Sequence, residues 1–101
     1  MDILKEIGEA AALEQLAEEC AELGKAALKM ARIIRGENPT PVTMAEAREN
    51  LLEELIDVCT CIDVCDFRAD AKQFDRMFSL KLDRWKQRIR EMKDGKKHNE
   101  S

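Results

Sequence analysis

Three long stretches of this chain repeat apolar residues at spacings of three and four, and few helix-breaking residues interrupt them. That spacing places apolar side chains on one face of an α-helix. The sequence of 101 residues holds only two prolines, four glycines and no tyrosine. Valine and isoleucine never alternate with polar residues over the length that a half-buried strand requires. These features predict an all-α fold, a helical bundle.

The first helices are predicted from the residues at their ends. A short helix over residues 2–7 precedes a weak break at Gly8, and a long helix follows from about Glu9 to Arg35, where Gly36 stops it. The apolar stripe of the long helix comprises Leu13, Leu16, Cys20, Leu23, Ala27, Ala31 and Ile34. The segment from Gly36 to Val42 is predicted to be a loop, because it contains both prolines.

Thr43 marks the start of the next predicted helix, because Thr43 and Glu46 form the pattern of a capping box. The helix extends to about Asp66. Its apolar residues cover much of the circumference: Leu51, Leu52, Leu55, Ile56, Val58, Cys59, Ile62, Val64 and Cys65. A surface helix needs only one apolar stripe. A helix this apolar needs neighbours on several sides, which predicts a homo-oligomer, at least a dimer.

The last predicted helix begins at about Phe67 or Asp70 and ends at about Met92. Its apolar stripe comprises Phe74, Phe78, Leu82, Trp85, Ile89 and Met92. A helix stop at Gly95 and the polar residues after it predict a disordered tail over residues 95–101. We therefore expect one helical domain over residues 1–94.

Charge and composition exclude several classes of protein. The formal net charge of −4 argues against a nucleic-acid polymer as partner. No apolar run approaches the roughly 20 residues of a membrane span, and the N-terminus lacks an export signal. We expect a cytoplasmic protein without a membrane partner. Its four cysteines are then expected to be thiols that act as small buried hydrophobic residues. A zinc site fits less well, because no histidine lies near them.

Two groups of acidic residues lie on the two helices that are expected to pack together. Glu18, Glu19 and Glu22 form E-E-x-x-E on the first, and Glu54 and Asp57 stand three apart on the second. Like charges at this spacing repel, and the repulsion rises if the groups face each other as water leaves. A divalent cation relieves it, and oxygen ligands suit Mg²⁺ or Mn²⁺. The alternative is solvated surface charge. A di-iron bundle fits poorly, because it uses histidine ligands and the only histidine lies in the predicted tail.

The two motifs, Glu18-Glu19-Cys-Ala-Glu22 and then Glu54-Leu-Ile-Asp57, resemble those of the MazG-like all-α nucleoside triphosphate pyrophosphohydrolases. The resemblance covers roughly residues 12–90. It implies a homodimer or homotetramer in which Glu19, Glu22, Glu54 and Asp57 hold Mg²⁺, with Mn²⁺ as a substitute. The implied reaction converts (d)NTP and water to (d)NMP and pyrophosphate, and its implied role is the removal of surplus or noncanonical nucleotides. Glu18 and Glu19 are the candidate catalytic residues, with Glu18 orienting or deprotonating the attacking water.

The last predicted helix carries a basic face that suits phosphate. Lys81, Arg84 and Arg88 recur at i, i+3 and i+7, and an arginine fork or a lysine charge binds phosphate oxygens. The alternative is an ordinary basic helix end, which the helix dipole favours. Trp85 could stack on a base, although a tryptophan on an apolar stripe is more often core. Asn50 on the preceding helix could contact a sugar or base.

Two other functions compete with nucleoside triphosphate hydrolysis. One is a non-catalytic helical assembly module, in which the acidic residues are surface charge and the apolar helix is only an interface. The other is a metal-dependent hydrolase of a different phosphoanhydride. Two acidic pairs together with a basic stripe favour the pyrophosphohydrolase, because an assembly module has no need for them.

Overall fold

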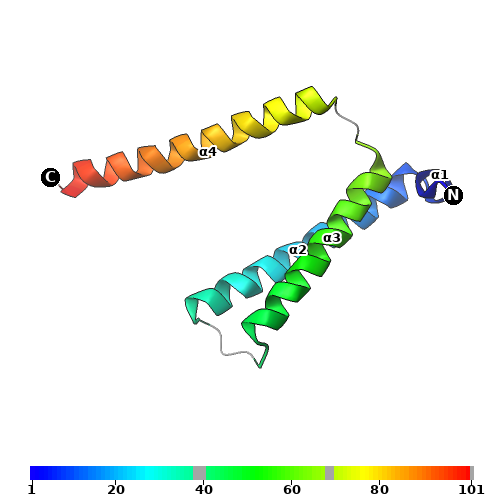
Figure 1. Cartoon of the computed structure of the whole chain (residues 1–101), viewed down its shortest axis with the longest axis horizontal. Helices are drawn as coiled ribbons and strands as arrows, with labels where there is room; N and C mark the ends of the chain where they lie inside the picture. Colours follow the sequence, from blue (N-terminus) through cyan, green and yellow to red (C-terminus); the bar gives the residue numbers. More distant parts are fainter. Residues whose placement is uncertain (38–40, 68–69, 101) are drawn as a thin grey trace. The chain divides into compact units, whose positions relative to one another are not determined.

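The computed structural model describes residues 1–37, 41–67 and 70–100, with the backbone alone for residues 97–100. In these ranges every regular element is an α-helix, which confirms the predicted all-α class. The helices are α1 (Ile3–Ile7), α2 (Glu9–Arg35), α3 (Met44–Cys65) and α4 (Ala71–Glu100) (Figure 1). Residues 38–40 of the predicted loop and residue 101 of the predicted tail lie outside the described residues. None of the helices, as far as they are described, is long and apolar enough to cross a membrane.

Local signals set the end of α2 and the start of α3 where the sequence predicts them. Gly36 follows α2 in the left-handed conformation, with φ 69° and ψ 20°, which favours glycine because it lacks a Cβ. Its N–H donates to the carbonyl of Ile33 at 3.1 Å. At the start of α3, Oγ1 of Thr43 accepts a hydrogen bond of 3.1 Å from the N–H of Glu46. This contact is one half of the predicted capping box.

α2 and α3 run side by side in opposite directions and supply the core of the first unit (Figure 1). Buried and half-buried side chains recur along both helices at alternating spacings of four and three, as at the contact positions of a coiled coil. We call these positions the seam. It comprises Ala12, Leu16, Glu19, Leu23, Ala26, Met30 and Ile33 on α2, and Ala47, Leu51, Glu54, Val58, Cys61 and Cys65 on α3.

The predicted apolar stripe of α2 differs from the seam by one position at several places. Leu13 and Ile34 are 41% and 63% exposed, whereas Ala12 and Ala26 are buried. Small side chains at the contact allow two helices to approach closely, which a count of large apolar residues does not reveal. The correction matters for function, because it places Glu19 within the contact stripe instead of beside it.

α1 is a single short helix at the end of the α2–α3 pair. The carboxylate of Asp2 accepts a hydrogen bond of 3.4 Å from the N–H of Lys5 at its start. Gly8, with φ 86°, separates α1 from α2, as the sequence predicts. α1 contacts both α2 and α3, so its apolar side chains can close a space between them.

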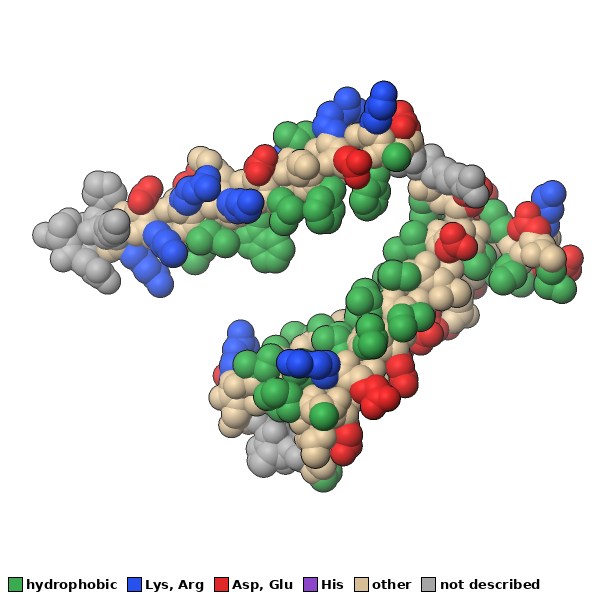
Figure 2. All heavy atoms as spheres, in the orientation of Figure 1, with side chains coloured by type: hydrophobic (Ala, Val, Ile, Leu, Met, Phe, Trp, Pro, Cys, Tyr) green, Lys and Arg blue, Asp and Glu red, His purple; other side chains and the backbone are tan. Residues whose placement is uncertain are grey.

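The chain divides into two compact units, residues 1–67 and 68–101, and α4 belongs to the second. Hydrophobic side chains lie along one side of α4 (Figure 2), and all its described side chains are exposed. α4 continues through Gly95 to Glu100, so the predicted helix end at about Met92 is wrong, whereas the disorder of residues 95–101 stays a prediction. The reason is that Gly95 lacks the positive φ of a glycine stop. That residues 1–94 form one helical domain stays a prediction.

All four cysteines are free thiols. Cys61 and Cys65 are half-buried on the seam, but Cys20 and Cys59 are exposed. The prediction that the cysteines act as buried hydrophobic residues is therefore wrong for Cys20 and Cys59. Each follows a seam residue directly, and one residue of a helix turns the side chain by about 100°, away from the partner helix.

Candidate metal centre

Two carboxylates interrupt a seam that otherwise consists of aliphatic, methionine and cysteine side chains. Glu19 occupies a seam position of α2, and Glu54 occupies a seam position of α3. Both side chains are half-buried where the two helices meet. Removing a carboxylate from water is unfavourable unless it gains a partner of opposite charge. The fold therefore forces two like charges toward each other at a place where apolar residues would pack better.

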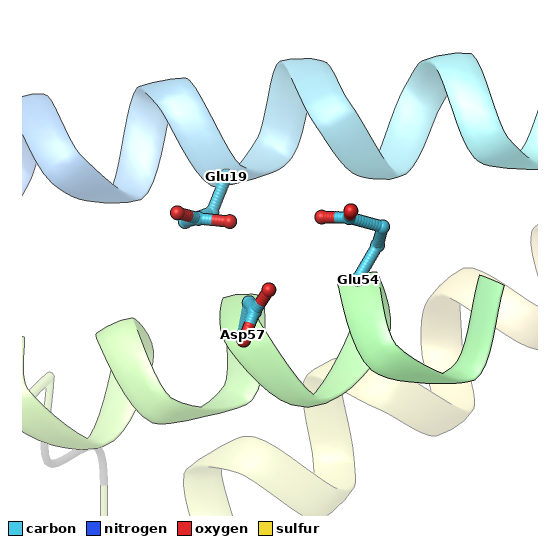
Figure 3. A group of neighbouring side chains, drawn as sticks. All are labelled: Glu19, Glu54 and Asp57. Carbon is cyan, nitrogen blue, oxygen red and sulfur yellow. The ribbon is translucent and has the colours of Figure 1, made fainter. Parts of the chain in front are cut away.

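Asp57 completes a group of three carboxylates. It lies one turn after Glu54 on α3, and its side chain points into the space that Glu19 and Glu54 share (Figure 3). One oxygen of each of the three residues lies within 4.8 Å of the others. Glu19 and Glu54 are half-buried, and Asp57 is exposed. The group is therefore accessible to solvent at Asp57, whereas Glu19 and Glu54 lie between the two helices.

The electrostatics of the group are those of crowded negative charge. Partial burial, followed by the negative charges of Asp57, Glu19, Glu22 and Glu53, raises the pKa of Glu54 above its ordinary value of 4.5. Each of these causes disfavours the ionised carboxylate. A bound cation would act in the opposite direction, because its positive charge favours the ionised form.

Gln15 stabilises the orientation of one member of the group. Its Nε2 donates a hydrogen bond of 2.9 Å to Oε1 of Glu19, one turn away on α2. Hydrogen bonds to ligating carboxylates are typical of metal sites, where they fix the ligand's direction. The sequence carries the signal as a Gln–Glu pair at i, i+4, but the predicted site did not include Gln15.

The donor set fits Mg²⁺ or Mn²⁺ better than a softer metal. Octahedral coordination at about 2.1 Å places neighbouring ligand oxygens about 3 Å apart and opposite ones about 4.2 Å apart. One oxygen of each carboxylate lies within 4.8 Å of the others, which is close to the separation of opposite ligands. Mg²⁺ characteristically keeps several waters, so three protein ligands are enough. Among the described residues, no group of this kind includes a cysteine, which leaves the zinc alternative without a cluster.

Two further predicted acidic residues of α2 lie outside the group of three. Oε1 of Glu22 lies 3.5 Å from Nζ of Lys25 in an exposed ion pair. Glu22 still contributes negative charge that raises the pKa of Glu54, so it belongs to the surroundings of the site. Glu18 is exposed on α2. The structure thus brings together three of the four predicted ligands.

The remaining predicted site residues lie on other surfaces. Asn50 is exposed on α3, one turn before Glu54. Lys81, Arg84, Trp85 and Arg88 lie on α4, in the second unit, and all four are exposed. They remain predictions for substrate contact.

Cys61 is a second residue near the carboxylates that the predicted site did not include. Burial, followed by the charges of Glu19, Cys65, Asp57 and Cys20, raises the pKa of its thiol. A raised pKa keeps the thiol neutral, so Cys61 offers an uncharged surface beside the negative group. Its position on the seam, one turn after Asp57, is the signal that could have identified it.

Comparisons of the chain with models of known protein families, with curated protein sequences and with solved structures found no match.

Proposed function

We propose that this chain is a MazG-like, Mg²⁺-dependent nucleoside triphosphate pyrophosphohydrolase of the cytoplasm. The reaction adds the oxygen of water to the α-phosphorus of a (d)NTP and breaks its bond to the α–β bridging oxygen. The products are a (d)NMP and pyrophosphate. Removal of surplus or noncanonical nucleotides is the role that we propose for it.

The observation that carries this proposal is the placement of carboxylates in the seam. Glu19 and Glu54 stand at positions where the neighbouring seam residues are apolar, and Asp57 adds a third negative charge. Residues that break the local rule of a packed interface are characteristic of functional sites. A divalent cation supplies the opposite charge that this group lacks.

In the proposed site each residue has a distinct task. Glu19, Glu54 and Asp57 hold Mg²⁺, and Glu22 adds negative charge nearby. Bound Mg²⁺ would offset the phosphate charge and lower the pKa of a coordinated water. Glu18 orients or deprotonates the attacking water from the neighbouring position on α2. Lys81, Arg84 and Arg88 bind phosphate oxygens through their shared face of α4.

We also propose that the protein works as a homodimer or homotetramer. Four large apolar residues of α3 point away from the seam: Leu52, Leu55, Ile56 and Ile62 are 55%, 46%, 54% and 46% exposed. Large contiguous apolar surfaces on a soluble domain mark interaction sites. A second copy of the chain would cover these residues and supply the neighbours that α3 needs.

The non-catalytic assembly module is the second candidate function. The exposed apolar stripe of α4 favours it, because such a helix needs a partner surface whether or not the protein is an enzyme (Figure 2). The two candidates differ in their response to Mg²⁺. A ligand that binds the folded state raises the melting temperature by mass action, and an assembly module should show no such rise.

The deciding experiment measures pyrophosphate release from a panel of NTPs and dNTPs, with Mg²⁺ and with EDTA. We expect release that depends on Mg²⁺ and that Glu54→Gln lowers by about 100-fold or more, about 2.7 kcal/mol of barrier. Glu53→Gln is the matched control, since Glu53 neighbours Glu54 on α3 but lies outside the group of three. It should keep near wild-type activity. A wild-type protein that is folded and oligomeric but inert on every nucleotide, with no Mg²⁺ effect on melting, would establish the assembly module instead.

A further inference from the structure

α3 carries a second stripe of regularly spaced side chains, on a side of the helix away from the seam. Its positions alternate by three and four residues, as those of the seam do, and all of them are exposed. This is the spacing of contact positions between two long helices. Hydrophobic side chains are visible along α3 in Figure 2. We call the stripe the outer face, and it comprises Ala45, Arg48, Leu52, Leu55, Cys59 and Ile62.

The N-terminal half of the outer face is hollowed. A groove of about 520 Å³ lies there, and its mostly apolar wall is formed by Met44, Ala45, Arg48, Glu49 and Leu52. All five of these residues belong to α3. Because side chains of one helix form the wall, the groove suits a side chain from another helix that lies along α3.

The outer face has charges of opposite sign near its two ends. Arg48 lies on the face, and Asp63 borders it fifteen residues later. Neither forms an ion pair within the part of the chain that the structure describes. The residues between them on the face are two leucines, a cysteine and an isoleucine. Such a face is complementary to itself when a second copy runs in the opposite direction, because the positive end then meets the negative end.

We propose that α3 of a second copy covers the outer face in the antiparallel direction, with a two-fold axis level with Leu55 and Ile56. Positions equally far from the axis then come level with each other. Leu52 meets Cys59 of the second copy, and Arg48 meets Asp63 of the second copy. Ile62 of the second copy comes level with the groove. The inference rests on the homo-oligomer proposed above and is independent of the proposed reaction, and it specifies the face, the direction and the register.

This interface leaves the carboxylate group open. Leu52 and Asp57 are five residues apart, so their side chains leave α3 in directions that differ by about 140°. Asp57 is the exposed member of the group. Each copy therefore keeps its own carboxylates accessible to a cation and to solvent, and the oligomer can be tested in the absence of both Mg²⁺ and nucleotide.

The native thiol on the outer face provides a test of the register. In the proposed dimer the Cys59 residues of the two copies are seven residues apart along the helices, about 10 Å. A disulfide requires Cα atoms within about 7 Å, so the wild type should not cross-link through Cys59. Leu52→Cys places a new thiol level with Cys59 of the second copy, at a position that is 55% exposed in the single chain.

We expect the full-length Leu52→Cys variant to form a covalent dimer with diamide, which takes up two hydrogen atoms as each sulfur–sulfur bond forms. Non-reducing electrophoresis measures the product. The double variant Leu52→Cys/Cys59→Ala should remain a single chain, because it lacks the partner thiol. Glu53→Cys is the matched control, since Glu53 is exposed beside Leu52 but lies about 100° further around the helix. It should not cross-link.

Charge reversal tests the ends of the same interface. Arg48→Glu and Asp63→Arg each bring like charges together, so each should raise the Kd of the dimer about tenfold or more. The double variant should return the Kd to near the wild-type value, because the pair is restored in reverse. Glu53→Arg makes the same change of charge off the face and should have little effect. Sedimentation equilibrium in EDTA, without nucleotide, provides the comparison.

The outcomes separate this inference from the proposed reaction. A monomeric wild type, a Leu52→Cys variant that does not cross-link, or a double charge variant that is not restored would overturn the interface. A dimer that both single charge variants leave intact would also overturn it and would assign association to another surface, such as the apolar stripe of α4. A protein that cross-links as expected but releases no pyrophosphate keeps the interface and loses the reaction. Pyrophosphate release without the cross-link has the opposite meaning.

Discussion

Residues 1–67 and residues 68–101 differ in both charge and burial. The first unit has six basic and fifteen acidic residues, a net charge of −9, and the second has eleven basic and six acidic residues, a net charge of +5. The first unit contains every buried residue of the described core, whereas the described side chains of α4 are all exposed. One region is a small folded unit with excess negative charge, and the other is a basic amphipathic helix (Figure 2).

The difference shows how the proposed chemistry is divided along the chain. An acidic unit is suited to hold a cation, and a basic helix is suited to bind phosphate. The two regions also differ in what stabilises their helices. The α2–α3 pair gains stability from its own seam, whereas an isolated helix is marginal in water and depends on packing of its apolar face. Substitutions of the same kind should therefore act differently in the two regions.

Truncating a methionine in each region should give the largest contrast in stability. Met30 is 6% exposed on the seam, and Met92 is 65% exposed on α4. We expect Met30→Ala to lower the free energy of unfolding by about 2–4 kcal/mol, since it leaves a cavity in a thin core. Met92→Ala should change it by less than about 0.5 kcal/mol. Urea denaturation followed by circular dichroism at low protein concentration measures both. Equal losses would mean that α4 is packed as tightly as α2.

The basic helix should affect substrate and not stability. We expect Arg84→Ala to lower kcat/KM for nucleoside triphosphates about tenfold, or 1.4 kcal/mol, while the melting temperature stays unchanged. The control is Arg90→Ala, because Arg90 lies on the same helix but off the face that Lys81, Arg84 and Arg88 share. Steady-state kinetics with Mg²⁺ in excess provide the comparison. Identical effects of the two variants would indicate general attraction by a basic helix.

The helix caps of the two regions should also differ. Thr43 caps α3 through the N–H of Glu46, and near the start of α4 the carboxylate of Asp70 accepts from the N–H of Lys72 at 3.1 Å. Thr43→Ala should lower the free energy of unfolding by about 1 kcal/mol, because α3 unfolds together with the seam. Asp70→Ala should reduce helix content but leave the main unfolding transition in place. A loss of stability with Asp70→Ala as large as that with Thr43→Ala would contradict the division into two regions.

The helices could be predicted well because their ends are encoded locally. Gly8, Gly36 and Thr43 each act through their own backbone or through a residue three positions away, and such signals are readable in sequence. The end of α4 could not be predicted in the same way. A glycine such as Gly95 stops a helix in this way only if its φ becomes positive. The value of φ at a glycine depends on more than the residue itself, so it cannot be read from the sequence at that position.

The candidate site could be predicted only in part, because it depends on how two helices rotate against each other. The i, i+3 spacing identified Glu54 and Asp57 as neighbours on one helix. Periodicity placed Glu19 beside the apolar stripe, whereas the structure places it on the seam, in line with the buried small residues Ala12 and Ala26. The same rotation places Glu22 outside the group, next to Lys25.

The smallest expected effect is the pH dependence of the carboxylate group. Because the pKa of Glu54 is raised above 4.5 in the folded protein, the folded state binds a proton there more tightly than the unfolded state. The contribution of Glu54 to stability is therefore fully present below about pH 4.5 and is lost as the pH rises through the raised pKa. Without Mg²⁺, the melting temperature of the wild type minus that of Glu54→Gln should fall as the pH rises from below 4.5 toward neutrality, and then level off. Added Mg²⁺ should reverse the fall at neutral pH in the wild type alone, since the cation binds the ionised carboxylates. A difference that is flat with pH and unaffected by Mg²⁺ would mean that Glu54 behaves as an ordinary surface glutamate. The acidic unit would then lose the cation-binding role that we propose for it, and its contrast with the basic helix would be one of charge alone.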